Sequence, residues 1–229
     1  MLSLDAALSN DAGRYYYSTL VTYLSGVSSI KTRHYSWAVV KFYYSIFYSL
    51  RSWLAINGDC LFYFEKTPFL LTAQSGESPV RKNGPSHDIL VKLFVERFSS
   101  NYFSTGEIDL MPAFDWLKSK REEVNYRTER FLDPAIPSFF QCLKKQSLRR
   151  LLEEYVSNTS YQWEFDPDHA VVALPFKLLL ELKSKLADKG VELEATPEER
   201  AFLRKSASDS SGPIAAVLRA TGVNETISD

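Results

Sequence analysis

The chain has 229 residues, with 27 Lys plus Arg against 28 Asp plus Glu and 45% hydrophobic side chains. This balance excludes a disordered tail, a collagen-like repeat and a disulfide miniprotein, and the length allows one or two domains. Residues 1–145 carry 17 basic and 14 acidic side chains and 26 of the 32 aromatic residues, whereas residues 146–229 carry 10 basic and 14 acidic ones. We therefore expect two differently built parts, neither basic enough to indicate nucleic-acid binding by charge alone.

Cysteine usage and hydropathy predict a cytoplasmic protein without a metal site or other cofactor. Cys60 and Cys142 lie far apart, and no Cys or His pair has the spacing of metal ligands. The N-terminus lacks a basic segment, and Asp5 interrupts its short apolar run. The most apolar stretch, residues 37–56, contains Lys41 and Arg51, so no membrane span is expected.

Apolar residues recur at helical spacing along most of the chain, which predicts an all-α fold. The first expected helix covers residues 14–24 and ends at Gly26 as a C-cap glycine. The second covers residues 32–57 and stops at Gly58. Because it is apolar around most of its circumference, we expect it in the middle of a bundle. Its aromatic residues and those at 15–17 are expected in the core or a dimer interface rather than stacked on nucleobases.

Residues 58–85 are rich in Pro and Gly, and their only strand-like stretch is Leu61 to Phe64. A connection of this length is typical of a functional or partly disordered loop. Ser86 is then the expected N-cap of a helix through residue 98. Asp109 precedes an expected helix over residues 110–129, with Pro112 in its first turn. A further helix is expected over residues 138–157.

The last part of the chain predicts three short helices, over residues 173–189, 197–207 and 213–221. Thr196 and Glu199 have the spacing of a capping box around Pro197. These helices are expected to pack on the main bundle or to form a small C-terminal subdomain. We therefore divide the chain into a helical bundle, 1–157, and a C-terminal helical extension or subdomain, 158–229.

Few residues suggest chemistry. The three histidines are far apart, and there is no nucleophile elbow and no glycine-rich phosphate loop. The exception is a cluster of basic and polar residues in the expected helix 110–129. Helical spacing puts Arg121 near Asn125, Lys120 near Arg127 and Tyr126 near Arg130. A guanidinium beside an amide and a phenol suits a phosphate or a ribose edge. The alternative is an exposed helix whose bases are neutralised by Glu122, Glu123 and Glu129.

Three segments together resemble the HEPN superfamily: WAVVKFYYSIFYSLRSWLAING at 37–58, SHDILVKLF at 86–94 and LKSKREEVNY at 117–126. The resemblance covers about residues 10–157. It implies an up-and-down bundle of four to five helices that commonly forms a homodimer. Members of this superfamily include metal-independent ribonuclease toxins, often paired with nucleotidyltransferase-like antitoxins, and non-catalytic subunits of defence or RNA-processing assemblies.

In the ribonuclease members an Arg followed after four to six residues by a His contacts the phosphate and stabilises the transition state. Arg121 matches the Arg, and Asn125 and Tyr126 occupy the next part of the motif. No His lies between Arg121 and Arg130. Because a phenol is a poor proton shuttle at neutral pH, we expect no hydrolysis. His87 matches a His that opens the third helix in many members, and we expect a structural or accessory role for it.

Three hypotheses follow. The first is a HEPN-like protein of a bacterial toxin–antitoxin or phage-defence system that binds RNA, a nucleotide or a partner protein without catalysis. The second is an active metal-independent endoribonuclease that uses Arg121 and Tyr126, with His87 as an accessory. The third is a scaffold or adaptor whose acidic C-terminal part docks on a partner. The expected RNA- or phosphate-binding residues are Lys118, Lys120, Arg121, Asn125, Arg127 and Arg130. The expected partners are a second copy, an antitoxin or a defence-complex subunit, with no membrane.

Overall fold

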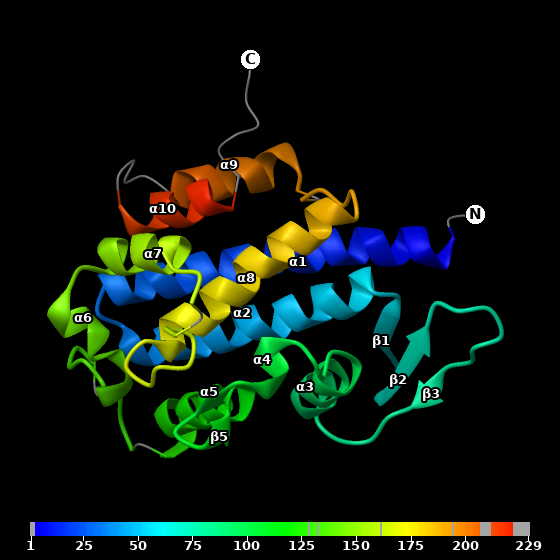
Figure 1. The fold of residues 1–229 in the computed structure, drawn as a ribbon, viewed down its shortest axis with the longest axis horizontal. Coiled ribbons are helices and arrows are strands. Elements are labelled where there is room, and N and C mark those ends of the chain that lie inside the picture. The colour runs from blue at the N-terminus through cyan, green and yellow to red at the C-terminus, as the bar shows by residue number, and fades with distance from the viewer. Residues whose placement is uncertain are drawn as a thin grey trace.

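The fold is predominantly helical, with only short strands, which confirms the all-α class. The computed structural model describes residues 3–127, 129–131, 133–160, 162–193, 195–206 and 212–221. Two long helices, α1 (Leu4–Lys31) and α2 (Tyr35–Ile56), lie side by side at its centre (Figure 1). Within the described ranges, no helix combines the length and the apolar character needed to cross a bilayer.

The α1 helix is longer than the sequence pattern predicts, and Gly26 lies inside it instead of ending it. A Cβ atom at residue 26 would be 2.6 Å from Cε1 of Phe42. The glycine is therefore needed for the close approach of α1 to α2. Hydroxyl groups join the two helices as well: Ser52 donates to the carbonyl of Ala12 at 2.7 Å and Ser45 to that of Thr19 at 3.2 Å.

The position of α2 in the middle of the bundle is as predicted. Phe42, Leu50 and Trp53 are at most 1% exposed. The helix ends just before Gly58, whose φ of +87° supplies the left-handed turn that stops it. The α8 helix (Ala170–Asp188) packs against both central helices, and the Tyr23 hydroxyl donates to the carbonyl of Val172 at 3.2 Å. Residues 170–188 therefore share the core of α1 and α2.

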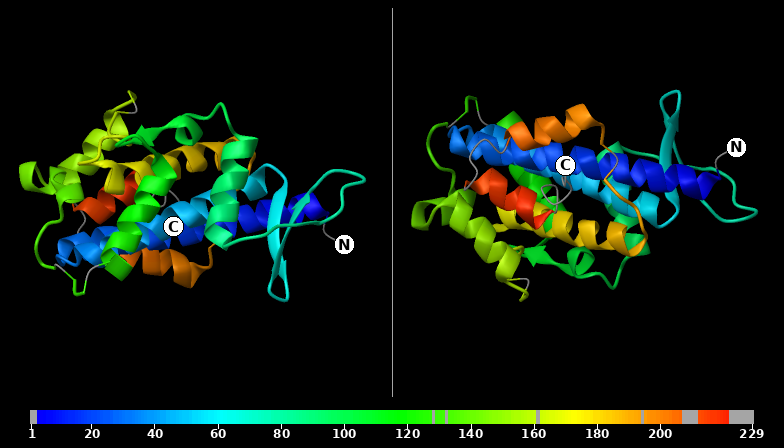
Figure 2. Two further views of the ribbon diagram at one scale, coloured as in Figure 1. Left: turned by 90° about the horizontal axis from the view of Figure 1, so that it is seen from below. Right: turned by 90° about the horizontal axis from the view of Figure 1, so that it is seen from above.

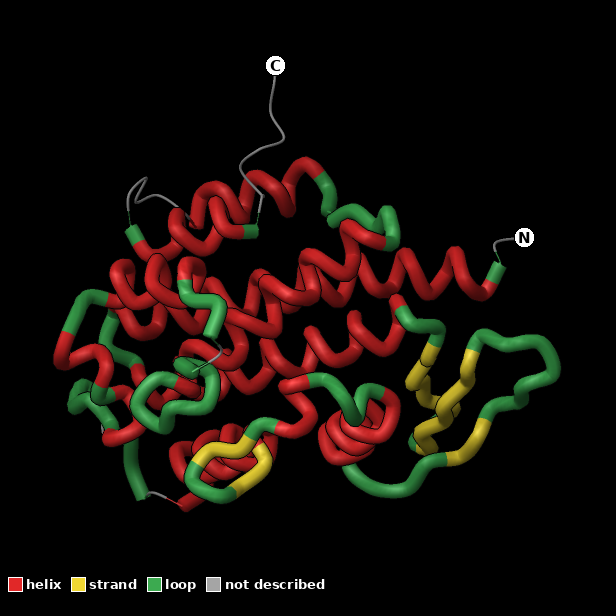
Figure 3. The backbone as a smooth tube through the Cα atoms, in the orientation of Figure 1, coloured by secondary structure: helices red, strands yellow, loops and turns green. Residues whose placement is uncertain are grey.

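Residues 58–85 form a small sheet instead of the expected irregular loop. Strands β1 (Asp59–Phe64), β2 (Thr67–Thr72) and β3 (Val80–Arg81) are antiparallel in the order β1-β2-β3 (Figure 3). Only β1 overlaps the predicted strand-like stretch. The β1–β2 register pairs Phe62 with Phe69, whose rings stack at 5.8 Å. Cross-strand aromatic pairs of this kind stabilise a hairpin whose individual strands carry little alternation.

The next segment differs from the prediction at its helix starts. Helix α3 (Ser86–Arg97) has Pro85 at its N-cap, and the Ser86 hydroxyl accepts from Tyr63. Helix α4 (Tyr102–Thr105) leads into a hairpin of β4 (Glu107–Ile108) and β5 (Met111–Pro112), after which α5 covers Ala113–Glu122. The expected start at residue 110 is therefore wrong. Asp109 caps no helix, because its carboxylate accepts from the Trp116 indole N–H at 3.1 Å.

The single helix expected over 138–157 is three pieces: η2 (Ser138–Phe140), α6 (Cys142–Lys145) and α7 (Leu148–Ser157). The break falls at Gln146, which is extended, and Ser147 then caps α7 by accepting from the Arg150 N–H. Last come α9 (Pro197–Ser206) and α10 (Pro213–Ala220), with α10 packed against α1 and α7 (Figure 2). The capping box is confirmed, because Thr196 and Glu199 bond reciprocally at 2.8 and 3.2 Å.

Candidate functional site

The basic cluster lies where α5 changes its helical pitch. After Glu122 the chain continues as a π-helical turn, η1 (Glu123–Arg127). A π turn brings together residues five apart, and single π turns are frequent at functional sites. The Arg121 guanidinium lies 5.2 Å from the centre of the Tyr126 ring, and Arg127 forms an ion pair with Glu122 at 3.6 Å. Both contacts span five residues, whereas α-helical spacing predicted a pairing of Arg121 with Asn125.

Arg121 lies between two aromatic rings. Its guanidinium is 5.5 Å from the centre of the Tyr43 ring on α2, in addition to its contact with Tyr126. Its Nε is buried and has no hydrogen-bond partner. Among the described residues no carboxylate lies within ion-pair distance of this guanidinium. Arg121 is therefore held by cation–π contacts, and at least one of its donors is unused.

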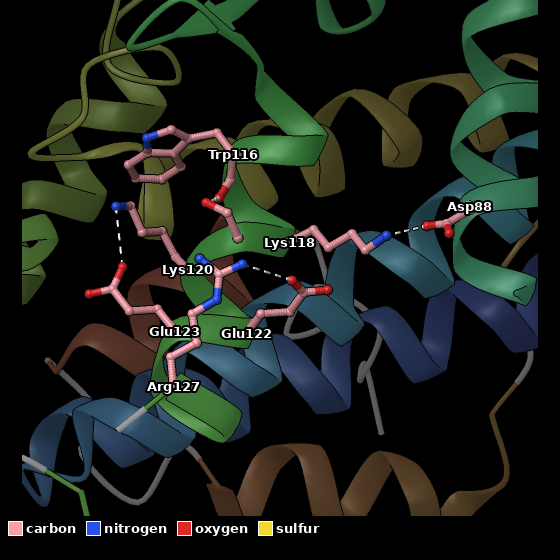
Figure 4. Close-up of polar contacts among 8 residues, drawn as sticks. Asp88, Trp116, Lys118, Lys120, Glu122, Glu123 and Arg127 are labelled. Atoms are coloured by element: carbon pink, nitrogen blue, oxygen red, sulfur yellow. Dashed lines mark hydrogen bonds and ion pairs between the residues drawn. The ribbon is translucent and has the colours of Figure 1, made fainter. Parts of the chain in front are cut away.

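Three neighbouring cations are different, because Lys118, Lys120 and Arg127 each have an acidic partner (Figure 4). Lys118 pairs with Asp88 of α3 at 2.5 Å, and Lys120 pairs with Glu123 at 3.4 Å. Arg127 has Glu122, as described above. The expected neutralisation by Glu122 and Glu123 is therefore found for Arg127 and Lys120, whereas Lys118 pairs with a carboxylate of another helix. Among the described residues neither Arg121 nor Arg130 has such a partner, and of these two Arg121 is partly buried whereas Arg130 is exposed.

His87 belongs to the same surroundings. It lies in the first turn of α3, and its ring contacts Phe47, Tyr43 and Tyr44 at centroid distances of 4.3, 5.3 and 5.6 Å. Its Nδ1 is buried and has no hydrogen-bond partner. Burial, and then the positive charge of Arg121, lower the pKa of the imidazole. His87 is therefore neutral at pH 7.

Tyr43 connects Arg121 to His87, since its ring touches both. Burial raises the pKa of the Tyr43 hydroxyl to about 12, although the nearby Arg121 favours the phenolate. The phenol is thus protonated at neutral pH. With His87 also neutral, the charged groups that act on these two rings are Arg121 and, around it, Asp88, Lys118 and Glu122.

An aromatic hollow opens beside these side chains, between α2, α3 and α5. It is small, with an accessible volume of about 10 Å³, which is room for about one water molecule, and its lining includes Tyr43, Phe47, His87, Val91, Phe114 and Leu117. Arg121 follows Leu117 by one turn of α5. Phe114 and Leu117 are buried, whereas Phe47, His87 and Val91 are partly exposed. The first two form the floor, and the other three form the rim.

The structure thus brings Arg121 and Tyr126 together, with His87 close by, and leaves other predicted residues apart. Asn125 is half-buried, and Arg130 is exposed beyond the π turn. Tyr43 and Phe47 were expected only in the core or an interface. Their spacing of four residues, on the face of α2 that meets the helix of His87, is the sequence signal that points to this shared surface.

Comparison of the chain with protein-family models, with curated proteins and with solved structures finds no match. The described residues contain no cluster of three or more His, Cys, Asp or Glu side chains that could hold a metal ion. The chemistry available at the candidate site is that of one guanidinium, its flanking aromatic rings and a neutral imidazole.

Proposed function

We propose that this chain is a HEPN-like protein that binds single-stranded RNA at Arg121 through a phosphate, without cleaving it. The observation that carries the proposal is the unpartnered guanidinium between Tyr43 and Tyr126. A buried donor without a partner costs roughly 1–3 kcal/mol, and more when it is charged. A fold bears such a cost most readily where a ligand supplies the missing acceptor. Phosphate oxygens match the planar donors of arginine.

The wider setting follows from the motif resemblance. We propose a bacterial toxin–antitoxin or phage-defence system, in which the chain forms a homodimer and meets a nucleotidyltransferase-like antitoxin or another defence subunit. RNA is favoured over a protein as the ligand of the Arg121 site, because proteins commonly bind single strands through cations that lie among aromatic side chains. Asn125 and Arg130 would add contacts to neighbouring phosphates. Lys118, Lys120 and Arg127 would contribute less, since their charges are already paired.

Two features favour binding over cleavage. The motif lacks its His, and Tyr126 is 69% exposed, so the phenol faces water instead of a dry catalytic cleft. A second candidate, a metal-independent endoribonuclease using Arg121, Tyr126 and His87, has one observation in its favour. The lowered pKa of His87 leaves a neutral imidazole that can accept a proton. The buried Nδ1 of this ring argues against such a role.

The test is fluorescence anisotropy of the full chain with a labelled single-stranded 12-nucleotide RNA. We expect Arg121→Ala to weaken binding about 10- to 100-fold, because a charged hydrogen bond contributes roughly 1.5–3 kcal/mol. Arg149→Ala is the matched control and should bind as the wild type does. Arg149 pairs with Glu153 on α7, and α7 and α5 lie on opposite sides of the α1–α2 pair in Figure 1. Equal affinity of Arg121→Ala and wild type would refute the proposed site.

The same samples, run on a denaturing gel after prolonged incubation, separate the two candidates. We expect the RNA to remain intact in the presence of the wild-type chain. Cleavage that disappears in both Arg121→Ala and His87→Ala would instead establish the ribonuclease. The Arg149→Ala control then guards against a contaminating nuclease, whose activity would be the same in every preparation.

A further inference from the structure

We infer that residues 162–169, which lead into α8, form a strap that lies closed on the fold while the Glu164 carboxyl is protonated and opens when it ionises. Glu164 is 0% exposed, and among the described residues neither of its carboxylate oxygens has a hydrogen-bond partner. A buried charge without a partner is strongly unfavourable, whereas a protonated carboxyl carries no charge. The closed strap therefore favours the protonated form.

Aromatic contacts hold the strap on both sides of Glu164. Phe165 lies on the backbone where α4 ends, and a Cβ atom at Gly106 would be 2.0 Å from its Cε1. Only a glycine at this position leaves room for the ring. On the other side, the Trp163 ring packs on the ring of His169 at a centroid distance of 4.3 Å. Because Glu164 lies between two anchored residues, its carboxylate reaches water when the strap moves.

The charged side chain that acts on Glu164 is Lys177 of α8. Its ammonium donates to the carbonyl of Asn158, at the end of α7, and gives the Glu164 carboxylate no hydrogen bond. The other two carboxylates of the strap have partners. Asp166 accepts from the backbone N–H of Asp168 at 2.8 Å, and Asp168 forms an ion pair with a lysine of α6 at 3.2 Å. Glu164 is thus the carboxylate that the closed strap leaves unsatisfied.

The pH dependence of the strap has a definite sign. Burial raises the pKa of Glu164, against the effects of its own backbone N–H and of Lys177. A raised pKa stabilises the closed strap below the ordinary value of ~4.3, and this contribution is lost as the pH rises through the raised pKa. His169 acts in the opposite direction, because burial lowers its pKa and protonation below ~6.5 would loosen the strap. A loosening that grows with pH is therefore due to Glu164.

Hydrogen exchange of the full chain, measured by mass spectrometry at pH 5, 6.5 and 8 and corrected for the intrinsic rates, tests this inference. We expect the opening of residues 162–169 to increase about 5- to 30-fold from pH 5 to pH 8, as for a change of one buried charge. Residues 102–108 should lose protection together with the strap, because Phe165 covers Gly106. Residues 35–56 of α2 report global unfolding and should stay protected.

Three variants separate the proton from the packing. Glu164→Gln keeps the shape of the side chain without its charge, so its strap should stay closed at pH 8. Glu153→Gln removes an exposed carboxylate that pairs with Arg149, and it should keep the pH dependence of the wild type. Phe165→Ala should open the strap further at every pH but leave the pH dependence in place, because the Glu164 carboxyl is unchanged.

The inference is overturned if the protection of residues 162–169 in the wild type is independent of pH. It is also overturned if Glu164→Gln keeps the wild-type pH dependence. A loss of protection that affects α2 to the same extent would show that the whole chain unfolds and that no separate strap exists. None of these outcomes depends on RNA binding at Arg121, which is measured separately.

Discussion

His87 and His169 are in similar surroundings but differ in one respect that separates a structural site from a candidate binding site. Each ring packs on an aromatic side chain at 4.3 Å, Phe47 for His87 and Trp163 for His169. Burial is the main cause that lowers the pKa of both. At His169 the Nδ1 is bonded to the Tyr155 hydroxyl at 2.8 Å, whereas the Nδ1 of His87 has no partner.

The two histidines differ in whether the fold supplies a hydrogen-bond partner for a buried ring nitrogen. The fold supplies a partner for the imidazole that joins α7 to α8, as expected for a buried polar group. It supplies none at His87, nor at the neighbouring Arg121 Nε. These two buried nitrogens belong to side chains that both contact the Tyr43 ring, and under the proposed function a ligand binds beside them. The comparison predicts that His169 matters for stability and that His87 matters for binding.

The largest expected effect is on stability. His169→Ala should lower the free energy of unfolding by about 3 kcal/mol, because it removes a buried hydrogen bond to the Tyr155 hydroxyl and leaves a cavity against Trp163. His87→Ala should lower it by only about 1 kcal/mol, since the ring is partly exposed and no hydrogen bond is lost. Urea unfolding at pH 7.5, followed by circular dichroism, measures both.

His34→Ala is the control for this pair. His34 is exposed and makes a local bond to Thr32 at 2.8 Å, so its removal should cost under about 1 kcal/mol. The comparison breaks down if His87→Ala destabilises the chain as much as His169→Ala does. His87 would then be a core residue like its counterpart.

Local signals made much of the helical fold predictable. The capping box at Thr196 and the stop at Gly58 depend on neighbouring residues, and both are found as predicted. Gly26 was misread because its role is set by Phe42, a contact between two helices that the spacing within one helix does not show. The sheet over residues 58–85 was missed for a related reason. Its register pairs β1 with β2, and neither strand alone has a clear alternation.

The candidate site was predictable only in part. The motif pointed to Arg121 and Tyr126, but α-helical spacing predicted the wrong neighbour, because a π turn begins two residues later. The ion pairs of the basic cluster could be predicted only as an alternative. The carboxylate that pairs with Lys118, for example, comes from α3, which is distant in sequence. The unpartnered nitrogens could not be foreseen at all, because the lack of a partner is a property of the packed molecule.

A second prediction tests both histidines through pH. Each pKa is lowered in the folded chain, whereas an unfolded His has a pKa of ~6.5. As the pH falls through ~6.5, the unfolded chain takes up protons that the folded chain refuses, and the free energy of unfolding decreases. The limiting slope is about 1.4 kcal/mol per pH unit for each histidine.

Urea unfolding at pH 7.5, 6.5 and 5.5 measures this slope. His87→Phe should flatten it while keeping the ring. At His169 the carboxylates of Asp166 and Asp168 oppose the effect of burial, so this residue should contribute less than its burial alone implies. A wild-type stability that is constant between pH 7.5 and 5.5 would show that neither imidazole resists protonation in the folded chain.

The smallest expected effect concerns Glu164. It follows Trp163, the residue that packs on the His169 ring, yet its carboxylate is buried without a hydrogen-bond partner. Its side chain is 0% exposed, and neither carboxylate oxygen has a hydrogen-bond partner. Burial raises its pKa, an effect that the residue's own backbone N–H and then the positive charge of Lys177 oppose. A carboxyl group whose pKa is raised in the folded chain adds stability at pH values below its ordinary pKa. This contribution is lost as the pH rises through the pKa of the folded chain. At pH 7 the buried charge therefore lowers the free energy of unfolding.

Glu164→Gln should consequently raise the free energy of unfolding at pH 7 by about 1 kcal/mol, or the melting temperature by about 2–4 °C. The gain should vanish near pH 4, where the wild-type carboxyl is protonated and resembles the amide. Glu153→Gln, at an exposed position paired with Arg149, is the matched control and should bring no gain. A loss of stability at pH 7 would mean that the attraction of Lys177 outweighs burial. Glu164 would then resemble His169, as a buried polar group that a neighbour within the fold stabilises.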